Sequence, residues 1–393
     1  MMKAMPNSLV SRLPGPPIPA VTAWARTYDG LRGPLIDLSQ AVPGYPTHPE
    51  MLRLLGEAAG MQAMTGYGPI EGESVLRQTY AAHMSNIYAS RICTENIHIT
   101  AGCNQAFMAT MIALARAGDR VAITNPFYFN HETTLSMLGI GSVLVECDAE
   151  NGFLPKMSSV EAALADGVKA LVIVSPNNPT GAIYSPDLLD SLYALCRKHG
   201  AWLVLDETYR DFLDEGSTPP HGLLSQMDWN ERLVLLYSFS KSLCIPGHRL
   251  GAITASPEVI QEISKVMDNM QICAPRAVQH AVSEALPKLA SWRAANRAEI
   301  ARRAKALTEV FAAAPEWSIA AIGAYFAFIK HPFEGQASTE IAERLASTAG
   351  VISIPGAFFG EGNDAYLRFA FANADVVTIR QLNTRLDKFP NHP

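Results

Sequence analysis

Three polar residues of the 393-residue sequence, Lys241, Asp206 and Asn178, stand at or just after the ends of short apolar runs. A lysine at the end of a buried strand is desolvated, which disfavours its ammonium form and leaves a nucleophilic amine. Such an amine can form a Schiff base with an aldehyde and can carry a proton during a reaction. A carboxylate is costly to bury unless a charged or hydrogen-bonded partner meets it. Taken alone, the three residues are also compatible with a solvated lysine, a helix cap and a turn.

A second set of residues supplies donors for an anion such as phosphate. Backbone N–H groups at the start of a helix favour an anion, both as donors and through the helix dipole. Arginine adds a fixed charge with a planar fork of donors. The candidates are Gly102, Cys103 and Asn104 at the start of a helical stretch, together with Ser238, Ser240 and Arg249.

Arg368 is a charged residue inside an apolar run. An unpaired charge in a buried strand is expensive, so its guanidinium needs an anionic partner. The carboxylate of a substrate is a natural bidentate partner, and a structural salt bridge is the alternative.

Continuous apolar runs, rather than alternating ones, precede these residues and predict strands that are buried on both faces. The runs are separated by room for helices, which is typical of an α/β protein with a largely parallel sheet. Ligands of such sheets bind beyond the carboxyl ends of the strands, where most of these polar residues stand. The predicted strands are 97–100, 120–124, 142–147, 169–175, 201–206 and 232–238.

The two ends of the chain differ from this middle part. The first 45 or so residues are rich in Pro and Gly and predict an extended arm over the surface. After residue 285 the sequence predicts a helix over 289–314, which is followed by the segment AYFAFIKHP (324–332), a helix over 338–350 and strands over 351–355 and 366–372. This order predicts a smaller α+β domain. We expect an arm (1–45) that contributes to the small domain, a large domain (46–285) and a small domain (286–393).

Composition excludes several classes of protein. A formal net charge of −6 argues against nucleic acid or an anionic membrane as the main partner. A hydrophobic fraction of 48% excludes a disordered chain, yet no apolar run approaches the ~18 residues of a membrane helix. The six cysteines show no CxxC spacing and the histidines no metal-ligand pattern, which predicts reduced thiols in a cytoplasmic protein.

Seven motifs, in this order and covering about residues 35–375, resemble those of class I and II aminotransferases. These are the fold-type-I enzymes that use pyridoxal 5′-phosphate. The lysine segment with an arginine eight residues on is the most specific motif, whereas NPTG alone would be weak. The motifs are YGPIEG (67–72), TAGCNQ (100–105), PNNPTG (176–181), DETY (206–209), SFSKSLCIPGHRLG (238–251), PGAFFG (355–360) and LRFAFA (367–372).

The resemblance implies roles for the residues around the cofactor ring. Lys241 would hold the cofactor as a Schiff base and carry the proton, and Asp206 would pair with the pyridine nitrogen. Tyr209 and Asn178 would hydrogen-bond the ring oxygen, and Tyr128 would stack on the ring. The phosphate would be bound by the backbone of Gly102, Cys103 and Asn104 and by Ser238, Ser240 and Arg249.

The resemblance also implies roles further from the ring. Arg368, with Asn178, would bind the α-carboxylate of the substrate, and His131 would lie behind Asp206. Tyr67 would reach the phosphate of the cofactor in the neighbouring subunit. The active unit would therefore be a homodimer with shared sites.

The fold implied by the resemblance is a three-layer αβα large domain with a mostly parallel sheet, plus a smaller α+β domain. The implied activity moves an amino group from an L-amino acid to a 2-oxo acid in a ping-pong cycle. β-Elimination from a cysteine-like substrate and decarboxylation stay open, because cofactor-binding residues do not decide which bond breaks. A regulatory module fused to a DNA-binding domain is a further alternative, but the arm of roughly 45 residues is too short for a winged helix.

Some positions depart from the family pattern. Ala41 stands where many relatives have glycine, and Cys103 where many have a hydroxyl residue. The stretch 267–276 has no arginine at the place where aspartate aminotransferases bind the side-chain carboxylate, since Arg276 falls after the proline. We therefore expect no strict aspartate specificity through that route.

Overall fold

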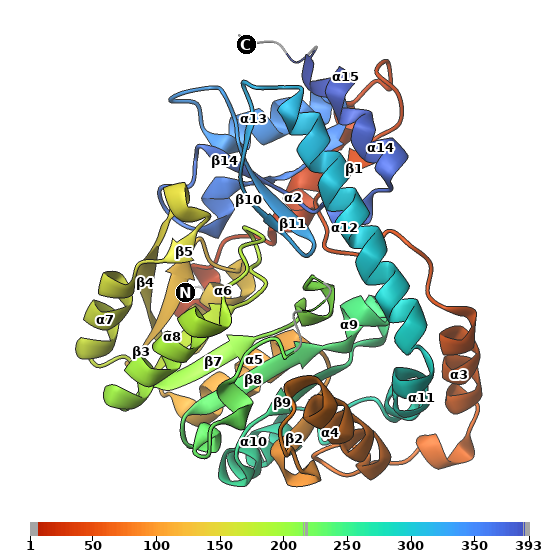
Figure 1. Cartoon of the computed structure of the whole chain (residues 1–393), viewed down its shortest axis with the longest axis vertical. Coiled ribbons are helices and arrows are strands. Elements are labelled where there is room, and N and C mark those ends of the chain that lie inside the picture. The colour runs from red at the N-terminus through yellow and green to blue at the C-terminus, as the bar shows by residue number, and fades with distance from the viewer. Residues whose placement is uncertain (1–6, 215, 217–218, 388, 390–393) are drawn as a thin grey trace, which may run out of the picture.

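A computed structural model describes residues 7–214, 216, 219–387 and 389 of the chain. Its largest feature is an eight-stranded sheet, shown in the lower half of Figure 1. In spatial order its strands are β2 (Ile97–Thr100), β9 (Gly251–Thr254), β8 (Leu233–Ser238), β7 (Trp202–Asp206), β6 (Ala170–Val174), β3 (Arg120–Asn125), β4 (Gly141–Asp148) and β5 (Leu154–Pro155).

The sheet is mostly parallel, as the sequence predicts. Strands β8, β7, β6, β3 and β4 pair in parallel. The short strand β9 runs antiparallel to both β2 and β8, and β5 runs antiparallel to β4. The carboxyl ends of β6, β7 and β8 therefore meet at one edge, where Asp206 and the segment that follows Ser238 stand.

Burial on both faces explains why the strand sequences are continuously apolar. In β8, Leu233, Leu235 and Tyr237 belong to one hydrophobic cluster, whereas Val234 and Leu236 belong to another. Side chains of a strand alternate between the two faces of a sheet, so each cluster is one side of it. Apolar residues are then required at every position, which removes the polar–apolar alternation of a half-exposed strand.

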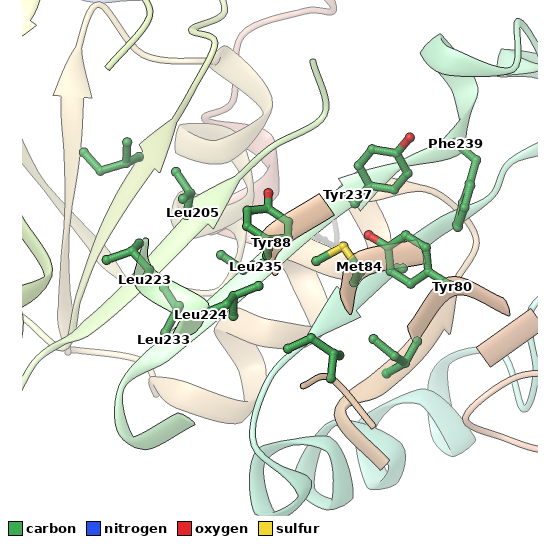
Figure 2. Packing of buried hydrophobic residues seen from close by; sticks show 14 of the residues in the cluster. Tyr80, Met84, Tyr88, Leu205, Leu223, Leu224, Leu233, Leu235, Tyr237 and Phe239 are labelled. Carbon is green, nitrogen blue, oxygen red and sulfur yellow. The ribbon is translucent and has the colours of Figure 1, made fainter. Parts of the chain in front are cut away.

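Helices cover both faces of this sheet and make the αβα layers. Residues of α5 (Cys103–Leu114), α6 (Phe129–Met137) and α10 (Pro257–Met270) belong to the cluster with Val234. Figure 2 shows the other face, where Tyr80, Met84 and Tyr88 of α4 lie near Tyr237. The helices of that face are α3 (Pro49–Ala59), α4 (Ser74–Tyr88), α7 (Met157–Ala165), α8 (Pro186–Lys198) and α11 (Arg276–Lys288).

A second, antiparallel sheet lies in the upper part of Figure 1, reached through the long helix α12 (Ala290–Ala312). Its strands are β10 (Ser318–Gly323), β11 (Phe326–Lys330), β14 (Tyr366–Phe369) and β13 (Ile354–Pro355). Three helices complete this part: α13 (Ser338–Arg344), α14 (Val376–Arg380) and α15 (Leu382–Asp387). The predicted α+β order is present here, and the domain boundaries at residues 45 and 285 stay predictions.

Two local expectations are wrong. The segment 351–355 was expected as one strand, but β12 (Val351–Ile352) pairs with β1 (Ile36–Asp37), while β13 pairs with β14. The arm was expected to be extended, but it contains the helices α1 (Ser8–Ser11) and α2 (Pro17–Trp24). Proline is accepted in the first turn of a helix, where an N–H has no partner in any case, so a Pro-rich start does not exclude a helix.

Gly181 makes a testable contribution to the fold, because its backbone lies against the second sheet. Its φ is 81°, and a Cβ there would lie 2.3 Å from the carbonyl oxygen of Phe326. Gly181→Ala combines a left-handed alanine with this overlap, so we expect the free energy of unfolding to fall by about 1–3 kcal/mol or more. Urea denaturation of the wild type and the variant measures this difference in the free energy of unfolding.

The matched control is Gly56→Ala in α3, where nothing lies within 4 Å of the added Cβ. Alanine in an exposed helix interior is better than glycine by roughly 0.5–1 kcal/mol, so this variant should be slightly more stable. Equal denaturation midpoints for the two variants would contradict the close packing at Gly181.

Candidate active site

A pocket of about 390 Å³ opens at the carboxyl ends of β6, β7 and β8. The first residues of α5, the arm near Ala41 and strand β14 complete its walls. The structure brings most of the candidate residues together here. Those that line the pocket are Cys103, Asn104, Tyr128, Asn178, Asp206, Tyr209, Ser238, Ser240, Lys241, Arg249 and Arg368.

Lys241 lies on the short helix α9 (Phe239–Ser242), directly after β8. The helix is capped by Ser238, whose Oγ accepts a hydrogen bond from the backbone N–H of Ser240 at 3.3 Å. The amine of Lys241 donates to the backbone carbonyl of Ala41. Burial lowers the pKa of Lys241 to about 8, with a further contribution from the charges of Arg249 and Arg368. A substantial fraction of the amine is therefore neutral near physiological pH.

Asp206 is a buried carboxylate with partners on both oxygens. Its Oδ1 accepts from the backbone N–H of Thr208 at 2.9 Å. Its Oδ2 lies 3.5 Å from Nε2 of His131 and 3.4 Å from Sγ of Cys103. Burial by itself would raise the pKa of Asp206, but the hydrogen bonds from His131 and Thr208 outweigh it and lower the pKa. Asp206 is therefore a buried anion at neutral pH.

His131 occupies the position expected behind Asp206. Its ring stacks on Phe107 of α5, with the ring centroids 4.0 Å apart. Tyr128 meets the same imidazole edge-on at 5.1 Å and accepts a hydrogen bond from Asn130 at 2.7 Å. The packing holds the imidazole against Asp206, which lies between His131 and the pocket.

A buried charge cluster, which sequence reasoning missed, anchors the turn between Asp206 and Tyr209. Glu207 accepts from the hydroxyl of Tyr88 at 2.5 Å and lies 3.1 Å from Nε2 of His221 and 3.3 Å from Nη1 of Arg210. Removing one partner of a buried ion pair typically costs about 3–5 kcal/mol, so this turn is strongly held. Charged residues next to an apolar strand, Glu207 and Arg210, could have indicated a buried charge cluster from the sequence. Their partners Tyr88 and His221 could not be identified, because they come from distant parts of the chain.

Tyr237 ties the lysine helix to α12. Its hydroxyl lies 2.7 Å from Oγ of Ser242, the residue after Lys241, and donates to Asp211 at 2.6 Å. Asp211 in turn accepts from Arg293 of α12 at 3.2 Å. The guanidinium of Arg210 lies over the Tyr237 ring, 4.0 Å from its centroid. Hydrogen bonds and an ion pair thus lead from the long helix to the neighbour of the reactive amine.

One end of the pocket fits a phosphate group. Gly102 has a φ of 92°, and a Cβ there would lie 2.3 Å from Nη2 of Arg249. The guanidinium therefore lies against bare backbone at the first turn of α5, whose N–H groups favour an anion. Among the described residues, the buried Oγ of Ser240 has no hydrogen-bond partner. An orphaned hydroxyl, an arginine and a helix start are suitable donors for the phosphate of pyridoxal phosphate.

The other end fits a carboxylate. Arg368 is buried, and its Nη1 donates to Oδ1 of Asn178 at 3.0 Å, while Nη2 donates to the carbonyl of Ser39. Within the described part of the chain its Nε has no partner. Burial lowers the pKa of Arg368 to about 10, so the guanidinium is still charged at neutral pH. Among the described residues no carboxylate forms an ion pair with Arg368, so a structural salt bridge there does not explain this buried charge.

Two further candidate residues, Tyr209 and Tyr67, differ in where the structure places them. Tyr209 lies in the pocket against Tyr325 and Phe326 of the second sheet, with ring centroids 5.3 and 5.1 Å away. Tyr67 lies outside the pocket and is 82% exposed.

The six cysteines are unpaired, and no cluster of His, Cys, Asp or Glu that could hold a metal occurs among the described residues. No described helix has the length and apolarity to cross a membrane.

The lowered pKa of Lys241 gives a pH-dependent test. A lysine amine reacts only when neutral, so labelling of Lys241 by acetic anhydride should rise with pH and reach half its maximum near pH 8. Exposed lysines of the same sample should reach it near the ordinary value of about 10.4. Mass spectrometry of peptides from cofactor-free protein follows both. A midpoint for Lys241 equal to that of the exposed lysines would contradict its desolvation.

Comparisons with known proteins agree with this site. Residues 33–386 match the family described as aminotransferase class I and II. The aromatic aminotransferase ISS1 of Arabidopsis thaliana is 27% identical over 360 residues, covering 90% of this chain and 89% of that protein. The aspartate/prephenate aminotransferase of Thermus thermophilus is 29% identical over 345 residues, which are 87% and 88% of the two chains.

The solved structures that resemble this chain point the same way. A double mutant of the Thermus thermophilus aspartate aminotransferase superposes with a TM-score of 0.90 at 26% identity, covering 99% of this chain and 100% of that one. The family match extends over nearly the whole chain and includes every residue of the pocket except Ile18. The chain therefore belongs to the class I and II aminotransferases, a family of enzymes that depend on pyridoxal phosphate.

Proposed function

We propose that this transaminase holds pyridoxal 5′-phosphate as a Schiff base on Lys241 and moves an amino group from an L-amino acid to a 2-oxo acid. One observation carries the proposal. An amine with a pKa of about 8 lies in the same pocket as the buried anion Asp206 and the guanidinium groups of Arg249 and Arg368. Lys241 could attach the cofactor covalently and Asp206 could pair with its pyridine nitrogen. Arg249 and Arg368 could bind the two anions, the phosphate and the substrate carboxylate.

The residues of the pocket divide into those for the ring and those for the phosphate. Asp206 would keep the pyridine nitrogen protonated, and Tyr209 and Asn178 would hydrogen-bond the ring oxygen. Tyr128 would stack on the ring. The phosphate would be bound by the backbone of Gly102, Cys103 and Asn104 with Ser238, Ser240 and Arg249. When bound, the cofactor supplies a sink for the electron pair left on the substrate Cα after its proton departs.

The protein's own part in the reaction is to orient the substrate and to move one proton. Arg368 and Asn178 would hold the α-carboxylate, and the free Nζ of Lys241 would take the proton from Cα and deliver it to the cofactor. The donor would leave as a 2-oxo acid, and its amino group would stay in the pocket. A second 2-oxo acid accepts that amino group, which closes a ping-pong cycle.

The active unit is a homodimer in this proposal. Tyr67 is exposed and would reach the cofactor phosphate of the partner subunit. Its segment is anchored by Arg276, which donates from Nη1 to the carbonyls of Ala63 and Gly66 and pairs with Glu73 at 2.5 Å. Met270 and Ile272 of the adjoining segment are also exposed, at 37% and 36%. Apolar side chains of this kind are typical of a surface that a second copy covers.

The remaining parts of the proposal concern organisation and compartment. An arm (1–45), a large domain (46–285) and a small domain (286–393) fit the two sheets, since the pocket lies where they meet. The cytoplasm is the proposed compartment, because the six cysteines are unpaired.

Lys241→Ala tests the proposed chemistry. The variant should lose the visible absorbance of the bound cofactor and at least about 10²–10⁴-fold in turnover, because both the attachment and the proton carrier are gone. Lys305→Ala, on the exposed side of α12, is the control and should behave as the wild type. Normal turnover of Lys241→Ala would sink the assignment. Analysis of the products of the wild-type enzyme should find a new amino acid. Pyruvate with ammonia would identify an eliminating enzyme instead.

Arg368→Lys tests carboxylate binding. Lysine keeps the charge but loses the planar fork, and hydrogen bonds to charged groups contribute about 1.5–3 kcal/mol each. We expect KM for the amino donor to rise roughly 10–100-fold, with cofactor absorbance retained. Steady-state kinetics with a saturating 2-oxo acid measure KM, and the visible absorbance spectrum shows whether the cofactor is retained. An unchanged KM would show that the carboxylate binds elsewhere.

A further inference from the structure

A second cavity, of about 930 Å³, adjoins the catalytic pocket. The two share three lining residues, Ile18, Phe129 and Asn130. The second cavity also borders the arm segment 14–20 and the turn around Phe358. The larger cavity is therefore a neighbour of the pocket of Lys241, and these three residues form the border between the two. Its size lies within the roughly 300–1,000 Å³ of small-molecule sites.

The arm forms a roof that is attached on both sides of this second cavity. Helix α1 packs against α6, while α2 packs against α13 and β13 of the second part. Below the arm, the backbone N–H of Phe127 donates to the carbonyl of Phe359 at 2.9 Å and joins the two walls. The second cavity is thus built from three segments that are distant in sequence and connected in space.

The walls of the second cavity are largely apolar. Phe127, Phe129, Phe358 and Leu144 line it, and the last is 40% exposed. The ring of Phe129 stacks on Phe359 with centroids 5.6 Å apart, so its orientation is fixed by packing. Partly exposed rings beside a reactive pocket can contribute apolar area to a ligand side chain.

The charge of the second cavity is opposite to that of the pocket. Glu132, Glu361 and Asp364 line it, and none of its described lining residues is Lys or Arg. In the pocket, Lys241, Arg249 and Arg368 face a single lining carboxylate, Asp206. An anion is therefore attracted at the pocket end and repelled at the cavity end.

We propose that the second cavity receives the side chain of the amino-acid substrate and selects large side chains that carry no negative charge. The inference rests on the proposed function, because Arg368 must hold the α-carboxylate at the pocket end. The apolar walls favour aromatic or long aliphatic side chains, and the three carboxylates disfavour the second carboxylate of aspartate or glutamate. The enzyme then has its specificity in a chamber roofed by its own arm.

The first test narrows the second cavity. Thr133→Trp on α6 and Leu144→Trp on β4 place an indole in it. The ratio of kcat/KM for phenylalanine to that for alanine should fall by at least about tenfold in each, since pocket size alone discriminates by such factors. Thr308→Trp, on the exposed side of α12, is the matched control and should keep the wild-type ratio. An unchanged ratio in both cavity variants would overturn the proposal.

The second test reverses a charge. Glu132→Lys should raise kcat/KM for glutamate by about tenfold, because an attraction replaces a repulsion. Glu150→Lys, in an exposed turn, is the control and should leave glutamate unchanged. The proposal is overturned if the wild type already prefers glutamate to phenylalanine, or if Glu132→Lys has no effect on glutamate.

A binding measurement separates this inference from the proposed function. Calorimetric titration of the holoenzyme with 4-phenylbutanoate, butanoate and glutarate requires no turnover. The phenyl compound should bind most tightly, and Thr133→Trp should abolish its advantage over butanoate. Tightest binding of glutarate would overturn the cavity proposal. A wild type that binds these carboxylates as expected, but transaminates no amino acid, would overturn the proposed function alone.

Discussion

An excess of positive charge in one pocket is the constraint on which the rest of this structure depends. Lys241, Arg249 and Arg368 line one pocket whose described walls include a single carboxylate, Asp206. Burying a charge is costly, so the buried guanidinium of Arg368 and the partly buried amine of Lys241 call for anions from outside the chain, while Arg249 is exposed. A phosphate at one end and a substrate carboxylate at the other would supply them. The same charges, added to burial, lower the pKa of Lys241 to about 8.

The protein holds this arrangement with a buried framework beneath the pocket. Glu207, Arg210, Asp211 and Arg293 balance one another as two acids and two bases, and tyrosines fill the space between them. The framework fixes the turn that carries Asp206 and, through Tyr237, the helix that carries Lys241. Buried charges that are paired in this way resist displacement, because breaking one pair leaves the other partner uncompensated. Rigid supports keep catalytic groups in place without touching the substrate.

Much of this could be predicted from the sequence because the relevant signals are local. The apolar run of β8 and the lysine just after it are adjacent in the chain, and so are Asp206 and Tyr209 with β7. Signals of only two to four residues were missed or misjudged: β9 was not predicted, and 351–355 divides between two sheets. The partners of Glu207 and the walls of the second cavity could not be predicted, because tertiary packing alone brings those segments together.

The central claim is that Lys241, among all the lysines, forms the covalent bond to the cofactor. Incubation of the protein with pyridoxal 5′-phosphate, reduction with borohydride and peptide mass spectrometry test it directly. The account predicts a phosphopyridoxyl group on Lys241, with its formation prevented when the protein is unfolded before the cofactor is added. A modification spread over exposed lysines, or one concentrated on a lysine outside the pocket, would contradict it.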